Sequence, residues 1–73
     1  MGEGDLMPKY HLTGYGTTEY FTAANDDEAA EHAKSVARSH GGAGVNLFPG
    51  DGTRKPKWGW HFNYAGRLIR VIT

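Results

Sequence analysis

The stretch Trp58-Gly-Trp-His-Phe-Asn-Tyr64 decides the fold of this chain, because it places an aromatic residue at every second position over seven residues. That spacing has the period of a β-strand, whose successive side chains point to opposite faces. Gly59, His61 and Asn63 stand between the aromatic residues, so one face is heavy and apolar and the other is light. The stretch therefore predicts a half-buried strand and not a membrane span, which needs about 20 apolar residues.

The chain has 73 residues, eight acidic and eight basic residues, no cysteine and a formal net charge of zero. That length allows one small domain. The absence of cysteine excludes disulfides and thiolate sites, and the start of the chain lacks the features of a signal peptide, so we expect a cytoplasmic protein. We expect residues 1–7 to be a disordered extension and residues 8–73 to form the single domain.

A capped helix is predicted from about Asp26 to His40. Asn25 is a favoured capping residue, and Glu28, three positions later, can bond back to the amide of the cap. Small apolar residues recur at spacings of three and four and form one flat face, at Ala29, Ala30, Ala33, Val36 and Ala37. Such a face lets the helix lie close to a sheet and leaves room for large aromatic residues from the strands.

Three further strands are predicted outside the aromatic stretch. Tyr10–Thr13 and Glu19–Ala23 are rich in β-branched and aromatic residues, and the glycines between them suit a tight hairpin. Val45–Phe48 alternates in the same way, and Pro49 follows it at once. Because proline cannot donate a backbone hydrogen bond, we expect this third strand to lie at or near an edge of the sheet.

The chain should close with a hairpin between residues 58–64 and 67–73, for which two registers compete. A two-residue turn at residues 65–66 would pair Trp60 with Val71 and force Ala65 to a positive φ. A type I turn over residues 63–66 instead places Asn63 and Gly66 at positions that each favours. We prefer the second register, which puts the aromatic side chains of Trp58, Trp60 and Phe62 on the face of Leu68, Arg70 and Ile72.

Together these elements predict an α+β fold. We expect a small antiparallel sheet of four or five strands, in the chain order strand-strand-helix-strand-strand-strand, with the single helix packed on one face.

Charge is distributed unevenly along the chain. Seven of the eight acidic residues lie in residues 1–31, and seven of the eight basic residues lie in residues 32–73. Residues 50–57 contain no large apolar side chain and are expected to form a mobile basic loop. The candidate binding residues, for protein or nucleic acid, are Arg54, Lys55, Lys57, Arg67, Arg70, Trp58 and Trp60.

The two tryptophans have two interpretations, which the sequence leaves open. They can form the core under the alanine face of the helix, which few other residues could fill, and we prefer this interpretation. Alternatively, they can lie on an exposed sheet face, where aromatic rings stack on nucleobases and nearby basic residues hold phosphates.

No pattern of catalysis or metal binding is present. The four histidines lack a metal-binding spacing, since His32 and His40 lie eight positions apart and a helical pair needs three or four. Ser35 and Ser39 stand on the solvated helix face without a residue to activate them. We therefore expect no catalytic residue, no metal and no cofactor, and a protein that is not an enzyme.

Three segments resemble parts of short phage and prophage accessory proteins. They are Lys9-Tyr-His-Leu, Tyr20-Phe-Thr-Ala-Ala and Asn25-Asp-Asp-Glu-Ala-Ala-Glu-His-Ala, and the closing Gly66-Arg-Leu-Ile-Arg70 is similar as well. Those proteins share a strand, a capped alanine-rich helix and a closing hairpin. The resemblance implies a class in which some members inhibit host defence nucleases, such as CRISPR complexes, by covering their surfaces. It transfers no functional residue.

The function expected from the sequence is that of a non-enzymatic binding module. A protein partner is expected at an exposed sheet edge or on the uncovered sheet face, and we also expect a homodimer by strand pairing or face packing. The alternative is a nucleic-acid-binding domain that uses the basic loop beside the tryptophans. No membrane partner is expected.

Overall fold

The structure, a computed structural model, describes residues 8–40, 44–53 and 55–72. The predicted extension at residues 1–7 and the candidate Arg54 lie outside the described residues. The elements are β1 Lys9–Thr13, β2 Glu19–Thr22, α1 Asp26–His40, β3 Val45–Pro49, β4 Gly59–Phe62 and β5 Leu68–Ile72. The predicted order of strands and helix is confirmed, with five strands.

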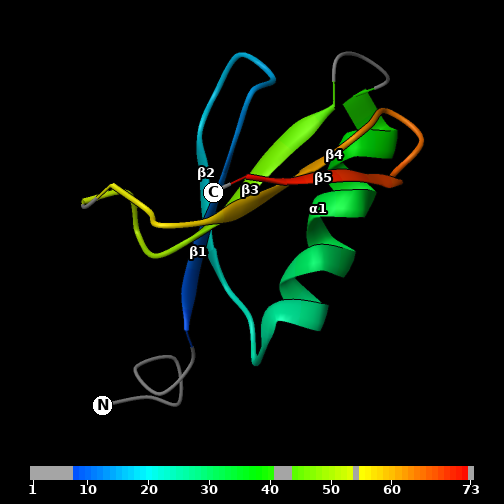
Figure 1. Cartoon of the computed structure of the whole chain (residues 1–73). Coiled ribbons are helices and arrows are strands. Elements are labelled where there is room, and N and C mark those ends of the chain that lie inside the picture. The colour runs from blue at the N-terminus through cyan, green and yellow to red at the C-terminus, as the bar shows by residue number, and fades with distance from the viewer. Residues whose placement is uncertain (1–7, 41–43, 54, 73) are drawn as a thin grey trace.

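All five strands form one antiparallel sheet in the order β2-β1-β3-β4-β5. The helix α1 packs on one face of this sheet (Figure 1). The predicted α+β class is therefore confirmed. The two edges of the sheet are β2, from the first hairpin, and β5, from the last.

The expectation that the third strand lies at or near an edge is wrong. β3 is the central strand, and it pairs with β1 on one side and β4 on the other. Pro49 is tolerated because it is the last residue of the strand, and the ladder continues beyond it through the amide of Gly50, which donates to the carbonyl of Lys9 at 2.7 Å.

The helix spans Asp26–His40, as predicted, and its start has the predicted cap. The side-chain oxygen of Asn25 accepts a hydrogen bond from the amide of Glu28 at 3.0 Å. The Glu28 carboxylate bonds back to the amide of Ala24 at 3.0 Å, one residue before the predicted partner. The first bond satisfies an amide of the first helical turn, which has no partner within the helix. The second satisfies an amide that lies just before the helix.

The core lies between the alanine face of α1 and the three inner strands. Ala29, Ala33 and Ala37 are completely buried, one helical turn apart. They pack against strand side chains that include Tyr10, Leu12, Val45, Leu47 and Phe62. The core interpretation of the aromatic stretch is right for Phe62 and partly right for Trp60, which packs against the core half-buried. It is wrong for Trp58, which is 37% exposed.

The closing hairpin combines the two competing registers. The amide of Gly66 donates to the carbonyl of Asn63 at 2.8 Å, and Gly66 has a φ of 79°, as the preferred type I turn requires. Phe62 accordingly pairs with Leu68. A bulge between His61 and Phe62 then shifts the pairing by one residue, so that the rest of the strand follows the other register.

The bulge corrects the predicted faces of β5. Trp60 pairs with Val71, and His61 pairs with Arg70. Directly paired residues share a face of the sheet, so Arg70 lies on the side of His61 and not on that of Trp60. Ile72 pairs with Gly59 and likewise leaves the face to which it was assigned.

Candidate functional site

The face of the sheet turned away from α1, here called the open face, is not covered by the helix. Tyr10 and Leu12 point into the core under α1, so the alternate residue, His11, points to the open face. Applied strand by strand to the pairing, the same alternation assigns to the open face Lys9, Thr13, Tyr20, Thr22, Asn46, Phe48, Gly59, His61, Arg70 and Ile72.

Aromatic rings from three neighbouring strands form a row across the open face. His11 of β1 pairs with Tyr20 of β2 and with Phe48 of β3. The ring centroid of His11 lies 6.1 Å from that of Tyr20 and 5.5 Å from that of Phe48. His11 is buried between its neighbours, whereas Tyr20 is 63% exposed and Phe48 is half-buried. The row therefore offers the rings of Tyr20 and Phe48 to solvent.

The orientation of His11 is fixed by the loop after β3. Its ring nitrogen Nδ1 lies 3.0 Å from the carbonyl oxygen of Gly50. A carbonyl oxygen can only accept, so Nδ1 carries the proton and donates. This bond ties the start of the loop to the centre of the ring row.

Gly59 lets the ring of Phe48 lie across β4. A Cβ atom at Gly59 would stand 2.4 Å from Cδ1 of Phe48 and 2.6 Å from the carbonyl oxygen of Leu47. No ordinary side chain fits in that space, because carbon atoms in contact lie about 3.5–4.0 Å apart. The glycine at this strand position is thus explained by the close approach of the neighbouring strand and ring.

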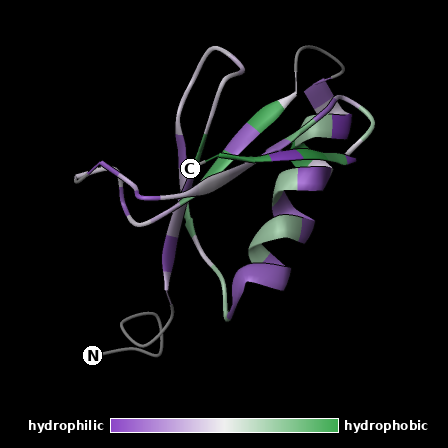
Figure 2. Ribbon diagram, in the orientation of Figure 1, coloured by the Kyte–Doolittle hydropathy of each residue, from purple (hydrophilic) through white to green (hydrophobic). Residues whose placement is uncertain are grey.

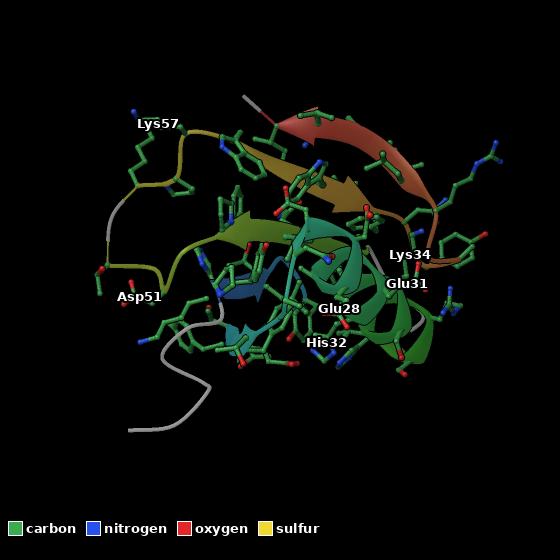
Figure 3. The ribbon with its side chains drawn as sticks, turned by 90° about the horizontal axis from the view of Figure 1, so that it is seen from below. Glu28, Glu31, His32, Lys34, Asp51 and Lys57 are labelled. Atoms are coloured by element: carbon green, nitrogen blue, oxygen red, sulfur yellow. The ribbon has the colours of Figure 1, made fainter. Side chains whose placement is uncertain are left out.

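A groove runs from this ring row to the loop between β3 and β4. Its volume is about 670 Å³, which lies within the range of small-ligand sites. We call it the aromatic groove, and its lining residues are His11, Phe48, Lys55, Pro56, Lys57, Trp58 and Ile72. Figure 3 shows Lys57 and Asp51 on the two arms of the loop at the same end of the sheet, away from Glu28 and Glu31 on α1.

The structure brings together only part of the predicted binding set. Lys55, Lys57 and Trp58 line the aromatic groove. Trp60 lies on the helix side of the sheet, although its ring meets that of Trp58 edge to face at a centroid distance of 4.5 Å. Arg70 is on the open face, paired with His61, and Arg67 belongs to the closing turn. Arg54 lies outside the described residues.

The lysines of the groove have no carboxylate partner among residues 8–40, 44–53 and 55–72, where the ion pairs are His32–Glu19 and Lys34–Glu31. The acidic residue of the loop, Asp51, accepts hydrogen bonds from the backbone amide and the hydroxyl of Thr53 at 3.0 and 2.6 Å. These bonds hold the pKa of Asp51 below its usual value, so its carboxylate is anionic at neutral pH. Asp51 does not line the aromatic groove.

A second exposed feature is the outer edge of the sheet. Leu68, Ile69 and Val71 of β5 are 47%, 54% and 54% exposed. The pattern of β5 is apolar on both faces, and Arg70 is its one charged residue. Figure 2 shows hydrophobic residues along most of this strand. The opposite edge differs, because Glu19 and Phe21 of β2 both contact His32 on α1.

A small hollow lies between β5 and the helix. It encloses about 250 Å³ and is lined by Asp26, Asp27, Ala30, Lys34, Trp60, Phe62 and Leu68. Its floor is apolar and its rim carries charges of both signs. A side chain of modest size fits such a space.

Two tyrosines among the described residues have raised pKa values. Burial, and then the Asp26 carboxylate, raise the pKa of Tyr10 to about 12, and its hydroxyl donates to Asp26 at 2.6 Å. Burial and Glu19 raise the pKa of Tyr15. Within the described part of the chain no three histidine or acidic side chains are placed to hold a metal ion. Nor does any helix described there have the length and apolar character to cross a membrane.

Comparison with known proteins finds no matching family model, no similar curated protein and no similar solved structure. The candidate site therefore rests on the geometry alone.

Sequence reasoning missed three residues that line the groove from the strands, His11, Phe48 and Ile72. The sequence does contain a pattern that could have identified two of them. His11 and Phe48 each alternate with core residues in their strands, which assigns both to the face without the helix. Their adjacency follows only once β1 and β3 are known to be neighbours.

Proposed function

We propose that this protein is a non-enzymatic binding module that takes an extended segment of a partner protein onto the edge strand β5. The observation that carries the proposal is the exposure of Leu68, Ile69 and Val71 on an edge strand of five residues. An edge presents unpaired backbone groups, and proteins normally protect it with charges, prolines or a covering element. Strand addition at such an edge is a recurring mode of peptide recognition.

Side chains beside the edge favour a partner segment of definite chemistry. On the helix side, Val71 and the hollow above Leu68 accept apolar side chains. On the open face, Arg70 lies exposed in the middle of the strand and favours an acidic residue opposite it. The preferred segment therefore alternates between apolar residues on one face and an acidic residue on the other.

The charge of Arg70 also disfavours a second copy of this chain as the partner that pairs with β5. Antiparallel pairing of β5 with itself about a two-fold axis centred on the strand places Arg70 opposite Arg70 of the copy. Like charges placed directly opposite each other destabilise a pair of strands. A partner protein that supplies an acidic residue avoids this cost, so we favour it over the homodimer expected from the sequence. The resemblance to phage accessory proteins adds host defence complexes to the partners worth testing.

Peptide selection with amide hydrogen exchange tests the proposal. Displayed peptides of about ten residues, long enough to cover one strand, should yield apolar sequences with an acidic residue. Their binding should slow exchange at the amides of β5. The substitution Val71→Lys should abolish binding, because it places a charge in the paired edge. The matched variant Thr22→Lys introduces the same residue on the exposed edge strand β2 and should bind normally.

Three results would contradict strand addition at β5. They are protection confined to β2, equal loss of binding in both lysine variants, and failure to select any peptide. The remaining possibility is a homodimer, which sedimentation across a hundredfold range of concentration tests. A dimer mass that Val71→Lys returns to that of the monomer would identify the occupant of the edge as a second copy.

A further inference from the structure

The aromatic groove lies on a different surface from the outer edge of β5 and calls for a different ligand. Its walls combine the exposed ring of Trp58 and the half-buried ring of Phe48 with two lysines, Lys55 and Lys57. Rings offer flat apolar faces, and ammonium groups attract anions. A ligand that satisfies both has planar apolar groups joined by anionic ones.

The ring row continues beyond the groove across the sheet. From Phe48 the row continues through His11 to Tyr20 on the edge strand β2. Neighbouring strands lie about 4.8 Å apart, so the row crosses a distance that several stacked or splayed bases occupy. Lys9 lies on the same face of β1, beside this row. A strand of nucleic acid laid across the sheet would meet these rings and Lys9, beside which the carboxylate of Asp51 also lies.

Acidic and basic residues gather on different parts of the molecule. The first turn of α1 carries Asp26, Asp27 and Glu28, on the opposite face of the sheet. On the open face the bulge places Arg70 with the lysines, because it pairs Arg70 with His61. The first turn of α1 is thereby acidic, whereas the open face and its loop carry Lys9, Lys55, Lys57 and Arg70 beside a single acidic residue, Asp51.

The geometry points to the aromatic groove as a binding site for single-stranded nucleic acid. Bases stack on Phe48 and Trp58, and the phosphates that join them bind Lys55 and Lys57. Stacking requires unpaired bases, so duplexes are excluded from the floor of the groove. An acidic peptide would satisfy the lysines but would leave the ring faces without planar partners.

The test is fluorescence anisotropy with a labelled oligothymidylate of about ten nucleotides, a length within the usual range of site sizes. The double variant Lys55→Ser/Lys57→Ser should bind more weakly and should reduce the slope of log affinity against log salt by about 1.4, which is about 0.7 for each lost phosphate contact. The matched variant Lys34→Ser/Arg38→Ser removes the same charge from α1 and should leave the slope unchanged.

A second variant separates stacking from charge. Trp58→Leu removes one ring from the groove and should weaken binding by about 5- to 150-fold without changing the salt slope. Trp58 is partly exposed, so its replacement is compatible with folding, and circular dichroism checks this. In a Trp60→Phe background, the emission of Trp58 should be quenched on addition of the oligonucleotide.

The inference fails if no oligonucleotide binds at low salt, or if the α1 variant loses as much affinity and slope as the groove variant. It also fails if a duplex of the same length binds as tightly as the single strand. Competition by an oligoglutamate of similar length at the same concentration would assign the groove to acidic peptides instead. None of these outcomes bears on strand addition at β5, which Val71→Lys tests independently.

Discussion

The close approach at Gly59 predicts that a single methyl group will destabilise the protein. In Gly59→Ala the new Cβ would stand 2.4 Å from the Phe48 ring and 2.6 Å from the Leu47 carbonyl oxygen. The ring can turn aside, but the carbonyl belongs to the backbone of the central strand and can move only with β3. Overpacking of this kind costs about 1–3 kcal/mol. Because two neighbours are affected, we expect about 2 kcal/mol, or a fall in Tm of about 8–16 °C.

The steric conflict determines whether Gly59→Ala lowers or raises the free energy of unfolding. Gly59 has no positive φ, so alanine is compatible with its backbone. Without a steric conflict, replacement of glycine by alanine stabilises a protein by about 0.4–1 kcal/mol, because it restricts the unfolded chain. Urea unfolding of Gly59→Ala therefore distinguishes the two cases. A midpoint equal to or above that of the natural sequence would refute the packing described at this position.

A double-mutant cycle assigns the cost to its two sources. Phe48→Leu removes the ring that would meet the new methyl group and leaves the carbonyl in place. The double variant Gly59→Ala/Phe48→Leu should therefore lose less than the sum of the single losses, with a coupling energy of about 1 kcal/mol. Additive losses would show that the ring of Phe48 does not lie against Gly59 in solution, and the floor of the aromatic groove would then differ from the one described.

Two further predictions concern the helix and its contact with β1. Asn25→Ala should cost about 1 kcal/mol in thermal or urea unfolding, because the Glu28 amide loses its 3.0 Å acceptor, whereas Asn25→Asp should unfold almost as the natural sequence does. The raised pKa of Tyr10, about 12, means that the folded state holds the phenolic proton more tightly than the unfolded state, whose pKa is near 10. Its contribution should be constant below pH 10 and should fall by about 2–3 kcal/mol as pH rises to about 12. The loss should be smaller in Tyr10→Phe when the urea unfolding curves are compared, and the part that remains should come from Tyr15, whose pKa is also raised.

Local signals explain why the helix was predicted correctly. The cap at Asn25 and the alanine spacing act within a few residues of the chain, and both favour the observed helix. The turn at residues 63–66 was predicted for the same reason, because Asn63 and Gly66 each suit their position in it.

Long-range pairing explains the errors. Nothing within Val45–Pro49 states which strands flank it, and the proline at its end suits both an edge strand and the end of a central one. In the structure Val45 and Leu47 are completely buried, as expected for a strand that lies at the centre of the sheet under the helix. The groove could not be predicted, because its floor depends on this placement of β3 between β1 and β4.

The bulge at His61 and Phe62 has the largest consequence for function. Without it, the register set by the turn would continue, and Arg70 would pair with Trp60 on the helix side, near the hollow that Asp26 and Asp27 line. Ile69 and Val71 would then face the open side. The one-residue shift moves the charge to the face that carries the lysines, and it leaves an aliphatic residue, Val71, on the helix side of the edge. Both proposed surfaces thus depend on one irregularity in β4–β5 pairing, which no local sequence pattern specifies.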